Sequence, residues 1–173
     1  MINSFSKTEI VGIMETIEAA HYCANEAGFK AVLQKAAYLL DAQYSVCGVG
    51  SSNLSRVSSV NGSYPKEWFD AYVAERLYLY DPVVRYQMNF PSTVNWRNIS
   101  RHCADEESRA FFARASAYGL VNGLSSGVYN HADGALSIFS FAGGSGRFDA
   151  RNKKILETIA PHLNIALSRL RTI

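Results

Sequence analysis

The fold is decided by the stretch Leu124-Ser125-Ser126-Gly127-Val128-Tyr129-Asn130-His131-Ala132-Asp133-Gly134-Ala135-Leu136-Ser137-Ile138-Phe139-Ser140-Phe141, in which two apolar segments flank a turn. Asp133-Gly134 supplies the turn chemistry of a β-hairpin, so residues 124–129 and 135–141 are predicted to pair as antiparallel strands. Apolar side chains alternate along the second strand, with Leu136 and Ile138 on one face and Ala135, Phe139 and Phe141 on the other. Because both faces are apolar, both sides of the sheet are expected to be covered.

Patterns typical of helices and strands surround this hairpin. Residues 44–49 and 56–60 predict a second hairpin, joined by the polar segment Gly50-Ser51-Ser52-Asn53. Helices are predicted from the N-cap Thr8 to about Gly28, over 29–40, over 65–78, from Asp81-Pro82, over 104–118 up to Gly119, and after the cap Asp149. The Gly143-Gly144-Ser145-Gly146 loop is expected to lead into the final helix. Together these elements predict helices on both sides of an antiparallel sheet.

Length and composition are those of one ordinary domain. A chain of 173 residues can bury a substantial core, and no repeat or linker divides residues 1–173. Although 48% of the residues are hydrophobic, no apolar run is long enough to span a bilayer. The start of the chain lacks a secretory pattern, so a cytoplasmic protein without membrane association is expected. A net charge of +2 gives little reason to expect that this chain binds nucleic acid by itself.

Motifs for catalysis and metal binding are missing from the sequence. The four histidines lie far apart, and none belongs to a His-Glu-x-x-His pair or a Cys-His cluster. The glycine segments at 48–50 and 143–146 match neither a dinucleotide loop, nor a phosphate loop, nor a nucleophile elbow. Cys23, Cys47 and Cys103 lack metal-ligand spacing and predict reduced, mostly buried thiols. Neither an enzyme nor a cofactor is therefore expected.

Most of the amphipathic aromatic residues gather around one acid between residues 64 and 96. They occur in Tyr64-Pro65-Lys66-Glu67-Trp68-Phe69-Asp70-Ala71-Tyr72, then in Tyr80-Asp81-Pro82-Val83, and then at Trp96. Asp81 stands among apolar and aromatic neighbours, where a carboxylate needs donors to satisfy it. With the strand serine Ser137, these residues supply an acceptor, donors and aromatic walls, which a pocket for a small amphiphile requires.

Structural roles also explain each of these residues when it is taken singly. Trp68 and Tyr72 are four residues apart on a predicted helix, so they share a face that could line a cavity or belong to the core. Asp81 before Pro82 could be a helix N-cap whose carboxylate accepts from backbone amides. From the residues alone, a ligand pocket and ordinary packing are therefore both open.

The spacing of this cluster resembles the autoinducer-binding domain of LuxR-type quorum-sensing regulators. That family's pattern contains Tyr-Pro-x-x-Trp-x-x-x-Tyr, Asp-Pro-x-Val, a proline followed by a tryptophan, and Gly-Leu-x-x-Gly-Leu. The matching segments here are Tyr64-Pro65-Lys66-Glu67-Trp68 with Tyr72, Asp81-Pro82-Val83-Val84, Pro91 followed by Trp96, and Gly119-Leu120-Val121-Asn122-Gly123-Leu124. The chain departs from the pattern in three places: Gly127 stands where proline is common, the Pro91 to Trp96 spacing is longer, and the loop before Tyr64 is short.

The resemblance implies a fold of the α/β (α+β) class, an α/β/α sandwich whose central five-stranded antiparallel sheet helps to enclose an N-acyl-homoserine lactone. Asp81 would accept the ligand amide N–H, Trp68 would donate to the lactone carbonyl, and Tyr64 would lie near the acyl carbonyl with Ser137. Tyr72 and Trp96 would form walls of the pocket. A further hypothesis gives the lining of the acyl tail as Val49, Val83, Phe111, Leu120 and Phe139.

The resemblance also implies a regulatory role with defined partners. Ligand would stabilise the fold or a homodimer, and DNA would be contacted only through a C-terminal helix-turn-helix domain, for which no residues follow the final helix. That helix carries an apolar stripe, which could be a dimer surface or could pack on its own sheet: Ile155, Ile159, Leu163, Ala166, Leu167 and Leu170. Two rival functions stay open, a GAF- or PAS-like sensor of another apolar metabolite and a hydrolase of acyl-lactones or acyl thioesters.

Overall fold

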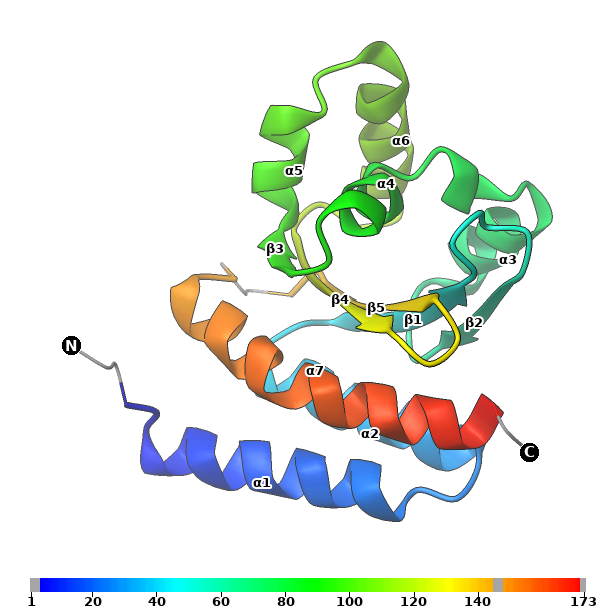
Figure 1. Cartoon of the computed structure of the whole chain (residues 1–173). Helices are drawn as coiled ribbons and strands as arrows, with labels where there is room; N and C mark the ends of the chain where they lie inside the picture. Colours follow the sequence, from blue (N-terminus) through cyan, green and yellow to red (C-terminus); the bar gives the residue numbers. More distant parts are fainter. Residues whose placement is uncertain (1–3, 145–147, 172–173) are drawn as a thin grey trace.

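A computed structural model describes residues 4–144 and 148–171 and contains one five-stranded sheet. The strands lie in the order β2-β1-β5-β4-β3, and each pairs with its neighbours in the antiparallel sense. Their bounds are β1 Tyr44–Gly50, β2 Val57–Asn61, β3 Thr93–Asn95, β4 Gly123–Asn130 and β5 Ala135–Ala142. Helices cover both faces of this sheet (Figure 1), so the expected sandwich of helix, sheet and helix layers is confirmed.

Both predicted hairpins are present. In the hairpin of β4 and β5, Asn130 pairs with Ala135, and the turn between them contains Gly134 at a φ of +71°. The Asp133 carboxylate accepts the backbone N–H of Ala135 at 2.9 Å, which fixes the turn. In the hairpin of β1 and β2, the pairing runs from Gly50 opposite Val57 to Val46 opposite Asn61.

One face of the sheet is covered by α1 (Lys7–Tyr22), α2 (Glu26–Leu39) and α7 (Ala150–Arg171), which lie below the sheet in Figure 1. The first helix differs from the prediction because its cap is Ser6, not Thr8. The Ser6 hydroxyl accepts from the backbone of Glu9 while the Glu9 carboxylate accepts from the backbone of Ser6, so two end donors are satisfied reciprocally. The helix ends at Tyr22, and Gly28 belongs to α2 instead.

The other face is covered by four helices and a 3-10 turn, namely α3 (Lys66–Ala74), η1 (Leu77–Leu79), α4 (Pro82–Asn89), α5 (Trp96–His102) and α6 (Glu106–Ser116). The predicted helix over 65–78 is wrong beyond Ala74, because Arg76 adopts a left-handed conformation that breaks it before η1. Asp81 opens α4 as predicted, and Gly119, at a φ of +83°, follows α6. Both β3 and α5 were missed, since such short elements leave no periodic pattern.

The apolar stripe of α7 faces the core on its side of the sheet. Five of the six stripe residues are buried, and Leu170 packs against the same core; the six are Ile155, Ile159, Leu163, Ala166, Leu167 and Leu170. Packing on its own sheet therefore accounts for the stripe, as the plainer of the two interpretations had it. Asp149 accepts from the backbone of Arg151 and Asn152 as expected of a cap, whereas Ser145 and Gly146 lie outside the described residues. Within those residues, none of the helices combines the length and apolar character needed to cross a membrane.

Candidate functional site

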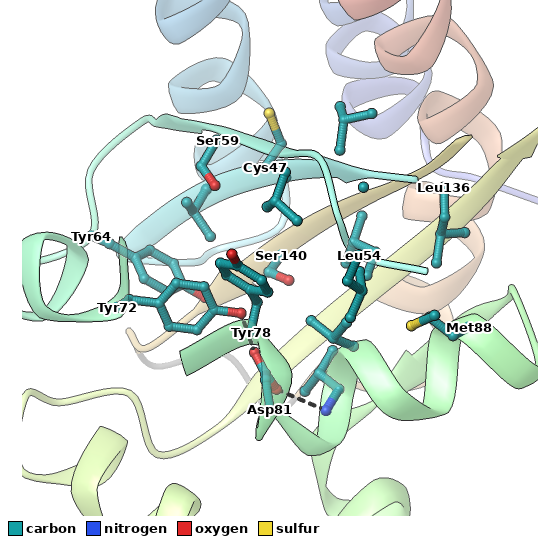
Figure 2. A pocket seen from close by; sticks show the side chains of 18 of the residues that line it. Cys47, Leu54, Ser59, Tyr64, Tyr72, Tyr78, Asp81, Met88, Leu136 and Ser140 are labelled. Atoms are coloured by element: carbon teal, nitrogen blue, oxygen red, sulfur yellow. Dashed lines mark hydrogen bonds between the residues drawn. The ribbon is translucent and has the colours of Figure 1, made fainter. Parts of the chain in front are cut away.

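A cavity of about 190 Å³ lies between the sheet and the layer formed by α3 to α6. Its walls are largely apolar and come from four strands, β1, β2, β4 and β5, and from helices on the far side (Figure 2). Eight of the nine residues predicted to bind ligand line it, namely Tyr64, Trp68, Tyr72, Asp81, Val83, Trp96, Phe111 and Leu120. The structure thus brings together residues that are up to 56 positions apart in the sequence, from Tyr64 to Leu120.

Asp81 combines the two roles that the sequence left open. One of its carboxylate oxygens accepts the backbone N–H of Val83 at 2.8 Å and caps α4, while the other accepts the hydroxyl of Tyr72 at 2.7 Å. The side chain also lines the cavity and is 9% exposed. Burial raises the pKa of this carboxyl to about 6, although the bonds from Tyr72 and the helix backbone lower it in part. Asp81 is therefore a cap and a cavity-lining acid at once.

Tyr64 presents a buried hydroxyl that has no hydrogen-bond partner among the described residues. Its backbone is held on both sides by Asn61, whose amide oxygen accepts from the N–H of Tyr64 and whose amide nitrogen donates to its carbonyl. Burial and the nearby charge of Asp81 both raise the pKa of this phenol, so it stays protonated and able to donate. An unpaired buried hydroxyl costs roughly 1–3 kcal/mol, which favours a polar partner supplied from the cavity.

The two tryptophans differ in how their indole groups are used. Trp96, the first residue of α5, donates its indole N–H to the hydroxyl of Ser125 at 2.8 Å. Ser125 in turn shares a hydrogen bond of 2.7 Å with Ser140 on β5, whose side chain lines the cavity. Trp68 instead packs by its ring against Tyr72, Phe111 and Tyr118, with centroids 5.5–6.0 Å apart. No described residue accepts a hydrogen bond from the Trp68 indole N–H, and Trp68 is among the residues that line the cavity.

The structure corrects the position of the strand serine. Ser137 lies on the face of β5 that is turned to α7, where its hydroxyl accepts from Asn130 at 3.3 Å, and it is not among the described residues that line the cavity. Ser140 lines the cavity instead, together with Leu136 and Ile138. The reason is the two-residue period of a strand, which puts 136, 138 and 140 on one face and 137 and 139 on the other. The alternation in the sequence placed Ser137 and Ser140 on opposite faces, but it did not show which face is turned to the cavity.

The same alternation corrects part of the tail hypothesis. Phe139 is fully buried in the core beneath α1, α2 and α7, on the opposite face from the cavity. Val49 borders the cavity along β1, but it also belongs to that core. Val83, Phe111 and Leu120 do line the cavity.

Gly123 and Gly127 of β4 are required by their neighbours on α4 and α5. A Cβ on Gly123 would overlap the indole ring of Trp96, and one on Gly127 would overlap the buried side chain of Gln87. The backbone N–H of Gly127 also donates to the carbonyl of Ser92 at 3.0 Å, which a proline could not do. These two contacts explain why glycine stands at position 127, where the family pattern commonly has proline.

Chemistry that needs a metal or a thiolate has little support here. Within residues 4–144 and 148–171, no group of three or more histidine, cysteine, aspartate or glutamate side chains is placed to hold a metal ion. Burial raises the pKa of Cys47 to about 12, so this thiol stays protonated at neutral pH. The polar groups that the cavity does offer are hydroxyl, indole and carboxyl groups, which suit binding through hydrogen bonds.

Comparisons with known proteins agree on one group of relatives. The family model described as the autoinducer binding domain matches residues 25–167. The N-acylhomoserine lactone-dependent LuxR family transcription factor CepR2 from Burkholderia cenocepacia has a similar structure, with a TM-score of 0.73, 21% identity and 93% of each chain covered. Escherichia coli SdiA gives a TM-score of 0.76 at 19% identity, over 94% of this chain and 68% of its own.

SdiA in complex with octanoyl-rac-glycerol is similar as well, with a TM-score of 0.76 and 19% identity over 97% of this chain and 69% of its own. At identities of 19–21%, the similarity of these structures shows a shared fold and nothing more. No protein in a collection of curated sequences matches the chain.

Proposed function

Because the chain belongs to the family of autoinducer-binding domains, we propose that its cavity binds an N-acyl-homoserine lactone as the sensory step of a LuxR-type regulator. The observation that carries the proposal is the pairing of polar groups in an otherwise apolar cavity. The unpartnered hydroxyl of Tyr64 offers a donor, and the buried carboxylate of Asp81 offers an acceptor. An acyl amide presents the complementary carbonyl and N–H a few ångströms apart.

Each polar group then has one part of the ligand to recognise. Asp81 accepts the amide N–H, Tyr64 donates to the acyl carbonyl, and Trp68 donates to the lactone carbonyl. Ser140 takes the place expected of Ser137 beside the acyl group, since its hydroxyl lines the cavity and Ser125 supports it. Tyr72 and Trp96 remain walls, because their polar tips are already bonded to Asp81 and Ser125.

The output of the site is stability rather than chemical conversion. A ligand that binds only the folded state stabilises it by RT ln(1 + [L]/Kd), about 2.7 kcal/mol at a hundredfold excess over Kd. Such a gain raises the amount of folded receptor or favours a homodimer. Contact with DNA would be made through a separate helix-turn-helix domain, as the resemblance to LuxR-type regulators implies.

Thermal melts with a ligand panel test the proposal. Hexanoyl-homoserine lactone should raise the melting temperature, and its ring-opened acid should do so far less, because the acid adds an unpaired charge to an apolar cavity. A sensor of some other apolar metabolite would not prefer the closed ring. Equal shifts with both compounds, or none with any acyl-lactone, would refute lactone sensing.

Octanoyl glycerol belongs in the same panel, because a related structure contains that compound. It lacks the amide N–H that Asp81 is proposed to accept, although its free hydroxyls can donate. We expect weaker stabilisation by this ester than by octanoyl-homoserine lactone.

Recovery of intact lactone, compared with a sample lacking protein, separates binding from hydrolysis. Loss of lactone that depends on the protein would favour the hydrolase.

A further inference from the structure

Aliphatic side chains gather at the end of the cavity away from Asp81 and Tyr64. Leu54 in the β1–β2 loop, Met88 of α4 and Leu136 of β5 lie together on one side in Figure 2, whereas Asp81, Tyr64 and Tyr72 lie on the other. This end approaches the surface, since Met88 is 38% exposed and half-buried Leu54 lies in a loop. A ligand held by its polar head would therefore direct its tail toward Leu54.

Leu54 has an unusual backbone conformation for its residue type. Its φ is +56°, in the left-handed region that a branched side chain rarely adopts. Local hydrogen bonds fix this conformation, because the N–H of Leu54 donates to the carbonyl of Ser51 and the Ser51 hydroxyl accepts from the N–H of Arg56. The loop is thus built around a residue that is strained there, as is often found at binding sites.

Gly50 lets the Leu54 side chain fold back over β1. A Cβ at Gly50 would lie only 2.9 Å from Cδ2 of Leu54, closer than side chains ordinarily approach. The absence of a side chain at Gly50 and the left-handed turn at Leu54 therefore act together. They bring the aliphatic side chain of Leu54 against β1, where it lines the cavity.

We propose that Leu54 closes the acyl-chain end of the cavity and sets the longest acyl chain that this protein binds tightly. The inference rests on the proposed function, because it assumes that the head group occupies the polar end. A tail shorter than the distance to Leu54 adds contacts with each methylene. A longer tail meets the Leu54 side chain and must displace it or bend.

The experiment compares dissociation constants for straight-chain acyl-homoserine lactones from butanoyl to dodecanoyl, with wild type, Leu54→Gly and Ser55→Gly. Glycine at 54 removes the side chain and suits the left-handed conformation, so the fold should be retained. Ser55→Gly is the matched control, since exposed Ser55 lies in the same loop and is not among the described residues lining the cavity. Leu54→Ala provides a second opening variant.

In wild type, the affinity should increase by up to about fourfold per methylene until the tail reaches Leu54, and then level off or decline. In Leu54→Gly the increase should continue, so that a chain two methylenes beyond the wild-type optimum binds at least tenfold tighter than to wild type. Ser55→Gly should keep the wild-type optimum.

An unchanged optimum in Leu54→Gly and Leu54→Ala would overturn the inference while leaving lactone binding in place. A wild-type affinity that rises steadily through dodecanoyl would overturn it as well. If no lactone of any length binds wild type, the proposed function itself fails, and the inference fails with it.

Discussion

Replacing Asp81 with asparagine should stabilise the ligand-free protein at neutral pH and weaken ligand binding. Burial raises the carboxyl pKa from 3.8 to about 6, so ionised Asp81 destabilises the fold at neutral pH by ~3 kcal/mol at most. Asparagine is an equally good N-cap for the Val83 N–H and carries no charge. We expect a gain of about 1–3 kcal/mol, with the melting temperature rising by roughly 2–4 °C per kcal/mol.

The pH dependence of stability follows from the same group. Folded Asp81 keeps its proton up to about pH 6, whereas the unfolded chain loses it near pH 4, so between these values the folded state binds more protons. The wild-type fold should therefore lose stability as the pH rises from about 4 to above 6, and Asp81→Asn should lack this loss. Glu9, whose pKa is lowered from 4.5 to about 2 by its hydrogen bond from Arg151, contributes stability that is lost as the pH falls between these two values.

Ligand binding should respond in the opposite direction. A neutral amide in place of the carboxylate removes a charge-assisted acceptor worth about 1.5–3 kcal/mol, so Kd for hexanoyl-homoserine lactone should rise roughly 10- to 150-fold. In wild type, binding should also weaken below pH 6, approaching tenfold per pH unit, because the ligand N–H requires an ionised acceptor. Calorimetric titration at several pH values measures both effects.

Asp105→Asn is the matched control, because Asp105 caps α6 in the same way but is exposed and is not among the described residues lining the cavity. The pKa of Asp105 is lowered by the backbone and hydroxyl of Ser108, so its charge favours the fold and its removal should slightly destabilise it. Lactone affinity should not change. If Asp81→Asn destabilises the ligand-free protein and leaves lactone affinity intact, Asp81 is only a cap and the argument from its burial is wrong.

Three further substitutions test the hydroxyl of Tyr64 and the packing of helices against β4. Tyr64→Phe removes the unpartnered hydroxyl, so thermal melts should show an unchanged or stabilised ligand-free fold, while titration should show lactone binding about tenfold weaker. Gly123→Ala should destabilise the fold by about 1–3 kcal/mol in urea unfolding, because the new methyl group overlaps the ring of Trp96. Gly127→Ala should do the same through Gln87, and stability equal to wild type in either glycine variant would contradict the packing described.

Much of the fold could be predicted from local patterns. The hairpin turn at Asp133-Gly134 and the stop at Gly119 carry their own conformational signals, because their glycines adopt positive φ in the structure. The break in the helix after Ala74 had no comparable signal, since Arg76 adopts a left-handed conformation that its residue type rarely takes. Neither β3 nor α5 was predicted, because a three-residue strand is defined by its pairing with β4 rather than by its own sequence.

The candidate site also contains residues that local sequence features predict and residues whose position depends on the fold. Trp68, Tyr72 and Asp81 could be placed together because a shared helix face and a helix cap are local features. Choosing between Ser137 and Ser140 depended on which face of β5 is turned to the cavity, and the sequence did not show this because both faces of the strand are apolar. What the strand alone could not give is why a hydroxyl is tolerated there. That depends on pairing across the sheet, where Ser140 stands opposite Ser125 of β4 and the two hydroxyls bond to each other. On the sheet side of the cavity, Ser140 thus finds its partner on the neighbouring strand, and such partners are set by register rather than by sequence proximity.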